Sequence, residues 1–253
     1  MIHFVGAGPG GADLITVRGA EMLKKADVII YAGSLVNPAL LEYSKDGCKI
    51  YNSATMTLEE VIDVMKDAEA KGLDTVRLHT GDPSLYGAIR EQMDLLDELK
   101  IQYTDTPGVS SFSGAAAALF AEYTLPGISQ SVVITRMAGR TPVPDRESIR
   151  SFAEHHCTMV IFLSTGLLED VSRELMEGGY GADEPAAIVY KATWPEQKVV
   201  RCTVGTLAQA ASENNITKTA LITVGGFLGT EYERSKLYDP TFTTEFRQAS
   251  HSK

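Results

Sequence analysis

A glycine-rich stretch near the N-terminus constrains the fold most strongly. Residues 5–16 read Val-Gly-Ala-Gly-Pro-Gly-Gly-Ala-Asp-Leu-Ile-Thr, with an apolar, strand-like run before them and a helical pattern after them. A strand, a glycine loop and a helix in this order are typical of a parallel α/β sheet, and glycines let the backbone approach a ligand closely. We therefore expect an α/β fold that binds a nucleotide-like ligand at this loop.

The loop matches the G-x-G-x-x-G pattern of dinucleotide-binding folds, but two features disfavour that function. Pro9 lacks the N–H group with which a helix N-terminus binds pyrophosphate. The second apolar run, residues 27–33, contains Tyr31 and Ala32 where a dinucleotide fold places an acidic residue for the ribose. NAD is thus disfavoured, and a nucleotide-binding oxidoreductase remains only as an alternative class.

Composition describes an ordinary globular protein of 253 residues, 44% of them apolar, which suffices for one large core or two smaller ones. The 33 acidic residues exceed the 23 basic ones and give a formal charge of -10, which disfavours a nucleic-acid or anionic-membrane surface. The three cysteines lie far apart, and no stretch is long and apolar enough to cross a bilayer. We expect a cytoplasmic protein that binds neither nucleic acid nor membranes.

Strand-like runs alternate with helical patterns through the first half, which is typical of a parallel sheet. The predicted strands are residues 2–7, 27–31, 49–52, 75–79 and 102–105. Thr57 and Glu60 predict a capping box at the start of a helix that Gly72 ends. A second helix follows Gly87, and an alanine-rich helix is expected over residues 113–122. The core-facing side of the second helix is predicted as Ile89, Met93, Leu96 and Leu99.

The pattern breaks near residues 125–128, so we predict an N-terminal domain of residues 1–125 and a C-terminal domain of residues 126–253. The second half opens with the run Ser-Val-Val-Ile-Thr at residues 131–135. Its predicted strands are residues 159–163, 186–190, 198–202 and 220–224, and its predicted helices are 146–155, 167–177 and 206–214. Residues 191–197 are too few for a crossover helix, so the strands that they join are expected to form an antiparallel hairpin in a mixed sheet.

Two further glycine-containing loops, residues 80–87 and 106–111, follow predicted strands. Each also fits a purely structural role, as a turn or, for Ser110 and Ser111, as a helix cap. Because the carboxyl ends of parallel strands share one edge of a sheet, we expect these loops and the first one to line that edge together.

Other residue types give weaker signals. Arg136, Arg140 and Lys191 flank loops and either bind a polycarboxylate or are solvated surface cations. His3 and His79 lie in apolar strands, where satisfied core or loop residues are expected. No zinc-ligand spacing, nucleophile elbow or Walker motif is present. The sequence therefore predicts no metal site and no named catalytic residue.

Three motifs together resemble the tetrapyrrole (corrin/porphyrin) methyltransferases, which use S-adenosylmethionine. They are Val-Gly-Ala-Gly-Pro-Gly at 5–10 with Asp-Leu-Ile-Thr at 13–16, Gly-Asp-Pro-Ser-Leu-Tyr-Gly at 81–87 and Pro-Gly-Val-Ser-Ser at 107–111. Longer matches at residues 31–37, 134–144, 190–195 and 219–228 resemble the branch that methylates carbon 11 of precorrin-4 or cobalt-precorrin-4 in cobalamin synthesis.

The resemblance implies a two-domain α/β fold, with a mainly parallel N-terminal sheet, a mixed C-terminal sheet and flanking helices. It also implies a homodimer, a tetrapyrrole substrate and S-adenosylmethionine bound in a cleft between the domains. At the matching positions of this chain, the resemblance implies the following cofactor contacts: Pro9, Thr80, Gly81, Asp82, Leu85, Ser110, Ser111, Leu163, Ser164 and Ala192. We assign Arg136, Arg140 and Lys191 to the carboxylates of the substrate.

The expected reaction is methylation of precorrin-4, with or without cobalt, at carbon 11 to give precorrin-5 or its cobalt form. A sister enzyme that acts at another ring carbon is the first alternative. A further alternative is a non-catalytic regulator that binds the cofactor, although this function leaves the loop that carries Arg136 and Arg140 unexplained.

Overall fold

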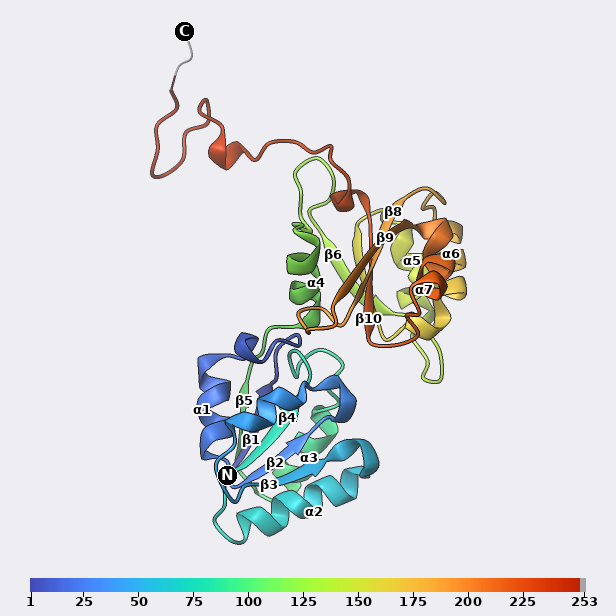
Figure 1. Cartoon of the computed structure of the whole chain (residues 1–253). Coiled ribbons are helices and arrows are strands. Elements are labelled where there is room, and N and C mark those ends of the chain that lie inside the picture. Colours follow the sequence, from blue (N-terminus) through green and yellow to red (C-terminus); the bar gives the residue numbers. More distant parts are fainter. Residues whose placement is uncertain (251–253) are drawn as a thin grey trace. The chain divides into compact units, whose positions relative to one another are not determined.

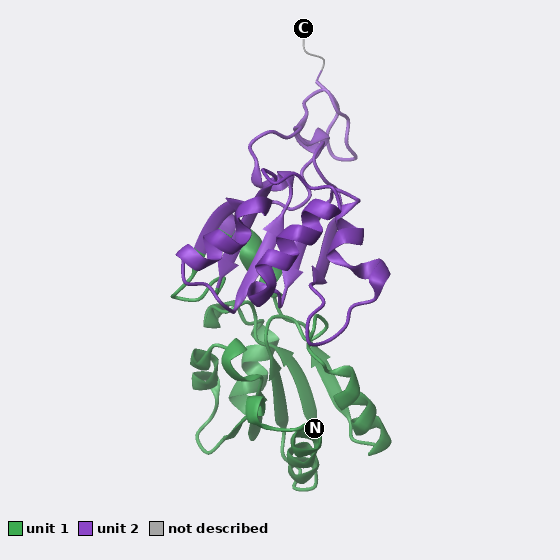
Figure 2. Cartoon of the chain, turned by 90° about the vertical axis from the view of Figure 1, so that its right-hand side faces the viewer, with its two compact units in different colours: residues 1–118, 191–198 green, residues 119–190, 199–253 purple. Residues whose placement is uncertain are grey.

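The computed structural model describes residues 1–250 of the chain (Figure 1). Two compact units are coloured in Figure 2: unit 1 contains residues 1–118 and 191–198, and unit 2 contains residues 119–190 and 199–253. Each unit has its own five-stranded sheet and its own apolar core. No helix of the described residues is long and apolar enough to cross a membrane.

Unit 1 holds a sheet in which every recorded pairing is parallel, in the order β3-β2-β4-β1-β5. Its strands are β1 (Ile2–Gly6), β2 (Val28–Tyr31), β3 (Lys49–Asn52), β4 (Thr75–His79) and β5 (Tyr103–Thr106). All five strands lie within a residue or two of their predicted positions. Strand β4 is buried over its whole length, as expected for a central strand covered on both faces.

The helices of unit 1 are α1 (Val17–Lys25), α2 (Leu58–Glu69), α3 (Arg90–Glu98) and α4 (Ser111–Leu119). Apolar side chains of α2 and α3 pack with Phe4 and Ile30 on one face of the sheet. Leu23 of α1 packs with Val5 and Leu78 on the other face. The unit is therefore a three-layer α/β/α sandwich.

The predicted capping box of α2 is confirmed: Thr57 accepts from the amide of Glu60, and the Glu60 carboxylate accepts from the amide of Thr57. Gly72 follows the helix with φ of +66°, a conformation that favours glycine. The predicted inner face of α3 is partly wrong. Leu99 is 44% exposed, whereas the polar Gln92 is buried at 4%.

Unit 2 holds a mixed sheet in the order β6-β7-β10-β8-β9. Strand β7 pairs with β6 in parallel and with β10 antiparallel, which confirms the predicted mixture. The strands are β6 (Val132–Arg136), β7 (Thr158–Phe162), β8 (Pro185–Tyr190), β9 (Lys198–Thr203) and β10 (Ala220–Val224). Strands β8 and β9 are neighbours, as predicted from their short connection.

Helices α5 (Ile149–Ala153), α6 (Leu168–Glu177) and α7 (Leu207–Glu213) pack on one face of this sheet around Ile161, Ile188 and Ile222. Helix α5 is shorter than the predicted 146–155, because Asp145–Glu147 form a separate 3-10 turn and Ser148 caps the helix after it. Beyond Thr230 the described chain forms a 3-10 turn, Lys236–Tyr238, within an otherwise irregular segment.

Candidate active site in unit 1

The three glycine-containing loops meet at one edge of the parallel sheet, as predicted. They follow the carboxyl ends of β1, β4 and β5. Gly8 and Gly81 form an isolated antiparallel bridge between two of the loops: the Gly8 amide donates to the Gly81 carbonyl at 3.2 Å, and the Gly81 amide donates back at 2.9 Å. This edge is where open α/β sheets bind their ligands.

Glycine is required where the loops approach each other most closely. A Cβ on Gly6 would lie 2.5 Å from the Cα of Gly108 and 2.6 Å from the carbonyl oxygen of Gly81. A Cβ on Gly108 would lie 2.7 Å from the Cα of Gly6 and would also collide with the Gly81 carbonyl. The glycines therefore let the backbones of three loops stack into one platform.

Backbone groups of the first loop are already bound within the protein. The Gly8 amide is taken by Gly81, and the Gly11 amide donates to the Thr193 hydroxyl at 2.9 Å. The Gly10 carbonyl accepts from the Asn37 side chain at 2.8 Å. Pro9 has no N–H, and the amides of Gly8 and Gly11 are already bound, so the loop offers few backbone N–H groups to an anion. The geometry therefore argues against pyrophosphate and against a dinucleotide.

Residues 191–198, which we call the strap, cover the first loop within unit 1. The Trp194 ring and the Ala192 carbonyl occupy the space that a side chain on Gly10 would need. Ala192 itself is 5% exposed. The Lys191 ammonium lies 4.8 Å from the centroid of the Trp194 ring and 3.5 Å from the Glu196 carboxylate. The strap thus holds the first loop in place and brings Ala192 and Lys191 to it.

Asp82 ties the second loop to the third. Its carboxylate accepts from the amides of Gly108 and Ser84, each at 2.9 Å, and from the Ser84 hydroxyl. Burial alone would raise the pKa of Asp82, but the hydrogen bonds from Ser84 and Gly108 outweigh it and lower the pKa. Asp82 is therefore an ionised clamp that orders the platform.

The other predicted contacts of unit 1 lie around this clamp. The Thr80 hydroxyl oxygen is buried and has no hydrogen-bond partner among residues 1–250. Leu85 is half-buried in the second loop, and Ser110 is 7% exposed. Ser111 begins α4, and its amide would lie 3.4 Å from a Cβ on Gly81. The structure thus brings Thr80, Ser110 and Ser111 to the same edge as the glycines.

Unit 2 contains the remaining predicted residues at the ends of β6 and β7. Ser164 is fully buried, and its hydroxyl donates to the Phe162 carbonyl at 2.6 Å while accepting from the Met137 amide at 2.8 Å. Leu163 is 63% exposed and has a left-handed φ of +54°. Ser164 therefore links the two strand ends and presents Leu163 outward.

The two arginines of unit 2 differ in their surroundings. The Arg136 guanidinium donates to the carbonyls of Met137, Thr141 and Pro142, at 3.4, 3.2 and 2.7 Å. Arg140, in the same loop, is exposed. Arg136 thus shapes the loop that carries Arg140.

Strand β4 carries buried polar side chains, of which the sequence patterns singled out His79 but not Arg77. Arg77 is 6% exposed, and His79 is 3% exposed with its Nε2 unpartnered among the described residues. The expectation of a buried core histidine is confirmed, but the expected hydrogen bonds at Nε2 are not found. Burial, with a smaller contribution from Arg77, lowers the pKa of His79 to about 3, so this imidazole is neutral.

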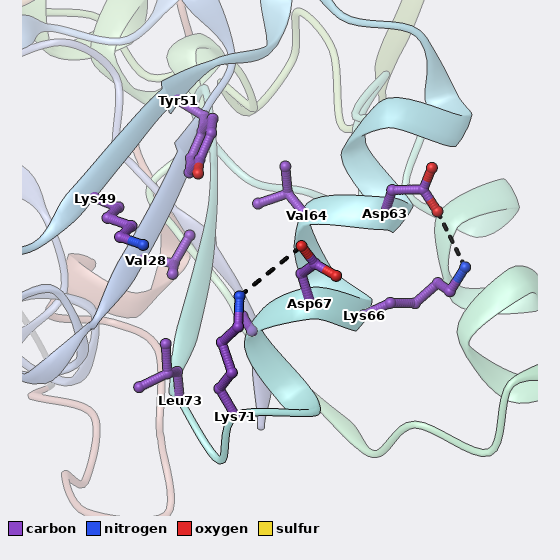
Figure 3. Close-up of a pocket in the computed structure, with 10 residues that line it drawn as sticks. Val28, Lys49, Tyr51, Asp63, Val64, Lys66, Asp67, Lys71 and Leu73 are labelled. Carbon is purple, nitrogen blue, oxygen red and sulfur yellow. Dashed lines mark hydrogen bonds and ion pairs between the residues drawn. The ribbon is translucent and has the colours of Figure 1, made fainter.

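A pocket of about 380 Å³ lies elsewhere in unit 1 (Figure 3). Val28 and Lys49, the first residues of β2 and β3, line it together with α2. It is therefore at the end of the sheet opposite to the glycine loops. Two of its lysines pair with carboxylates of the same helix, Lys66 with Asp63 at 3.0 Å and Lys71 with Asp67 at 3.9 Å. None of the predicted site residues lines this pocket.

The platform of glycine loops lies at the carboxyl edge of a parallel sheet, which is where α/β proteins of this class bind small molecules. Comparison with protein families matches residues 1–208 to the Tetrapyrrole (Corrin/Porphyrin) Methylases. The chain belongs to this family of methyltransferases, which confirms the resemblance drawn from its motifs.

Two curated relatives match along essentially their whole length. The chain is 52% identical to the cobalt-precorrin-4 C(11)-methyltransferase of Methanocaldococcus jannaschii, covering 100% of this chain and 97% of the relative. It is 46% identical to the enzyme of the same name from Priestia megaterium, covering 99% of each.

Solved structures agree on the fold. The X-ray structure of a cobalamin biosynthetic enzyme, cobalt precorrin-4 methyltransferase, superimposes with a TM-score of 0.88 at 46% identity, covering 90% of this chain and 96% of that one. A Thermus thermophilus uroporphyrin-III C-methyl transferase complexed with S-adenyl homocysteine gives a TM-score of 0.73 at 25% identity, covering 90% and 92%.

Proposed function

We propose that this protein methylates carbon 11 of precorrin-4 or cobalt-precorrin-4, with S-adenosylmethionine as methyl donor, in cobalamin biosynthesis. The observation that carries the proposal is 52% identity, over the whole chain, to a relative named for that reaction. The platform of unit 1 supports it, because its glycine loops match the family motifs and its occupied amides disfavour a phosphate ligand.

The platform fits a sulfonium cofactor. S-adenosylmethionine carries adenine, ribose and an amino acid but no phosphate, so it needs scattered donors and acceptors rather than an anion nest. The buried Thr80 hydroxyl has an unused hydrogen-bonding capacity, and Leu85 offers an apolar side chain in the same loop. We propose that Pro9, Thr80, Gly81, Asp82, Leu85, Ser110, Ser111, Leu163, Ser164 and Ala192 hold the cofactor.

The protein's part in the reaction is positioning. When bound, the cofactor would supply an electrophilic methyl group: the ring carbon would form a bond to it, the carbon–sulfur bond would break to leave S-adenosylhomocysteine, and the methylated macrocycle would release a proton. The Asp82 clamp and the Gly8–Gly81 bridge fix the loops before binding, so little order remains to be gained in the transition state. The strap residue Trp194 packs over Gly10 and so fixes the first loop as well.

We assign the substrate's carboxylates to Arg136, Arg140 and Lys191. Arg140 is the most direct test, since Arg136 also supports its own loop. Replacing Arg140 with Ala should raise the KM for the tetrapyrrole about tenfold, the value of one charge-assisted hydrogen bond, and leave the Kd for S-adenosylhomocysteine within twofold. Arg146→Ala, an exposed arginine of the same connection, is the matched control. An equal loss in both constants for Arg140→Ala would contradict the assignment.

Two alternatives are kept for the same platform. A sister enzyme acting at another ring carbon would share the cofactor site and differ only in the methylated position. A nucleotide-binding oxidoreductase is disfavoured by Pro9 and by the bound amides of Gly8 and Gly11. A thermal-shift comparison of S-adenosylhomocysteine with NAD separates a methyltransferase from an oxidoreductase, because a ligand that binds the native state raises Tm.

We further propose that residues 1–125 and 126–253 act as two domains and that the enzyme is a cytoplasmic homodimer. Sedimentation equilibrium tests the dimer, for which the expected mass is twice the 27.4 kDa of one chain.

The test of the proposed reaction is anaerobic incubation with S-adenosylmethionine and a panel of tetrapyrrole intermediates, with and without cobalt, read by mass spectrometry. We expect one added methyl group on the precorrin-4-stage substrate. Methylation of an earlier intermediate instead would favour the sister-enzyme alternative.

A further inference from the structure

A buried cation occupies the centre of unit 1. Arg77 lies in the middle of β4, beside Phe4 of β1 and Ile30 of β2, and is 6% exposed. No carboxylate within residues 1–250 lies within 4.0 Å of it. Burial lowers the pKa of Arg77 to about 10. Because an unpaired buried charge costs several kcal/mol, its presence at this position needs a compensating role.

The guanidinium is bound to neutral groups that lead away from the sheet. Its Nη1 donates to the Ile30 carbonyl at 3.2 Å, and its Nε donates to the Gln92 Oε1 at 3.0 Å. Gln92, on α3, is itself 4% exposed, and its Nε2 donates to the Ala88 carbonyl at 2.9 Å. These contacts form a continuous chain from β4 to the end of the second glycine loop.

The segment that this chain reaches is held in an unfavourable backbone conformation. Ala88 has a φ of +49° and Tyr86 a φ of +57°, left-handed values that a residue with a Cβ rarely adopts. Such conformations persist only where surrounding contacts impose them. Asp82 fixes the start of the same segment, and the Gln92 amide fixes its end. Leu85, a proposed cofactor contact, lies between the two.

The positive charge of Arg77 determines which way the Gln92 amide points. A guanidinium has only donors, so the amide must turn its oxygen toward Arg77 and its NH2 group toward Ala88. With a neutral, apolar neighbour the amide would be free to flip, and its oxygen would then face the Ala88 carbonyl. The charge of Arg77 thus keeps the Gln92 NH2 group turned toward the Ala88 carbonyl, to which it donates.

We propose that Arg77 and Gln92 are positioning residues that hold loop 80–88 in its cofactor-binding shape. This inference rests on the proposed function, because that function assigns Thr80, Gly81, Asp82 and Leu85 to the cofactor. Within residues 1–250 neither side chain is hydrogen-bonded to a proposed ligand contact, so their effect passes through the Ala88 carbonyl.

Gln92→Glu tests the mechanism, because it preserves the hydrogen bond to Arg77 and breaks the hydrogen bond to the Ala88 carbonyl. The carboxylate still accepts from Arg77 and even pairs with its charge, but it presents an oxygen rather than an NH2 to Ala88. We expect Tm to fall by only a few degrees or to rise. The Kd for S-adenosylhomocysteine, measured by titration calorimetry, should rise about tenfold, the equivalent of about 1.4 kcal/mol for one lost hydrogen bond.

The matched control is Leu96→Ala, one helical turn further along α3 in the same core. Leu96 is fully buried, so its truncation lowers Tm, but it leaves the Gln92–Ala88 bond intact. Its Kd for S-adenosylhomocysteine should stay within twofold of the wild type. If Gln92→Glu is insoluble, Arg77→Met is measured in its place, with the same expected rise in Kd.

Hydrogen exchange of residues 84–90 provides a readout that needs no ligand. Gln92→Glu should speed exchange there, and Leu96→Ala should do so no more than elsewhere in unit 1. A Kd within twofold of the wild type and unchanged exchange in Gln92→Glu would overturn the proposal, as would an equal weakening by Leu96→Ala. Failure of the wild type itself to bind S-adenosylhomocysteine would refute the proposed function, while the exchange comparison would still test the positioning role.

Discussion

Replacing Asp82 with Asn tests whether the carboxylate clamp orders the glycine platform. In the wild type one carboxylate oxygen accepts from the Gly108 amide and the other from the Ser84 amide, both at 2.9 Å. An Asn side chain has one oxygen and one NH2 group. Whichever way the amide is turned, one backbone N–H then faces a donor and loses its acceptor.

The expected loss of stability in Asp82→Asn follows from these hydrogen bonds. One hydrogen bond to a charged group is lost and one partly buried N–H is left unsatisfied, which together cost about 2 kcal/mol. For a chain of this length that corresponds to a Tm lower by about 4–8 °C. Asp63→Asn is the control: Asp63 is 69% exposed and pairs with Lys66 on the surface of α2, so its replacement should cost less than about 1 kcal/mol.

The pH dependence gives the sharper test. The folded-state pKa of Asp82 is lowered below its ordinary value of 3.8, so its stabilisation is present above that value and is lost as pH falls through the folded-state pKa. Urea unfolding of both proteins should therefore show the full difference at pH 7 and a shrinking one below about pH 4. A difference under about 0.5 kcal/mol at pH 7, or one that does not change with pH, would show that the Asp82 carboxylate is not the clamp.

Two further predictions concern the strap and β4. Gly10→Ala drives a methyl group into Trp194, the single tryptophan of the chain, so we expect a red-shifted emission and weaker binding of S-adenosylhomocysteine; an unchanged spectrum would contradict the packing. Burial lowers the pKa of His79 to about 3 from 6.5, so the unfolded chain binds one more proton between these values. Through this residue the free energy of unfolding should fall by about 1.4 kcal/mol for each pH unit below pH 6.5. In urea titrations His79→Phe should reduce the dependence of this free energy on pH by that amount. Equal pH dependence in both proteins would show that His79 is not held neutral.

Local patterns predicted much of the fold. The buried β4 is a continuous run bounded by turn residues, and the Thr57–Glu60 box lies immediately before an apolar stripe, so period and capping chemistry agree at both places. The meeting of the glycine loops also followed from local information. Once the strands are parallel, their carboxyl ends must share an edge, and the bridge between Gly8 and Gly81 realises this.

Contacts between distant segments were beyond such patterns. Gly11 finds its partner in Thr193, 182 residues further along the chain, and no spacing rule links the two. Arg77 and Gln92 look like surface residues by type, yet they are buried because each satisfies the other. Leu99 shows the reverse error: the periodic stripe of α3 continues through it, but the helix ends at Glu98 and leaves it exposed.

The position of the transferred methyl group distinguishes the proposed activity from that of a sister enzyme. The most direct measurement is incubation of cobalt-precorrin-4 and metal-free precorrin-4 with S-adenosylmethionine labelled with carbon-13 in its methyl group, followed by NMR of the product. We predict a single labelled methyl group attached to carbon 11. A label on any other ring carbon, or none on either substrate, would contradict the proposed function.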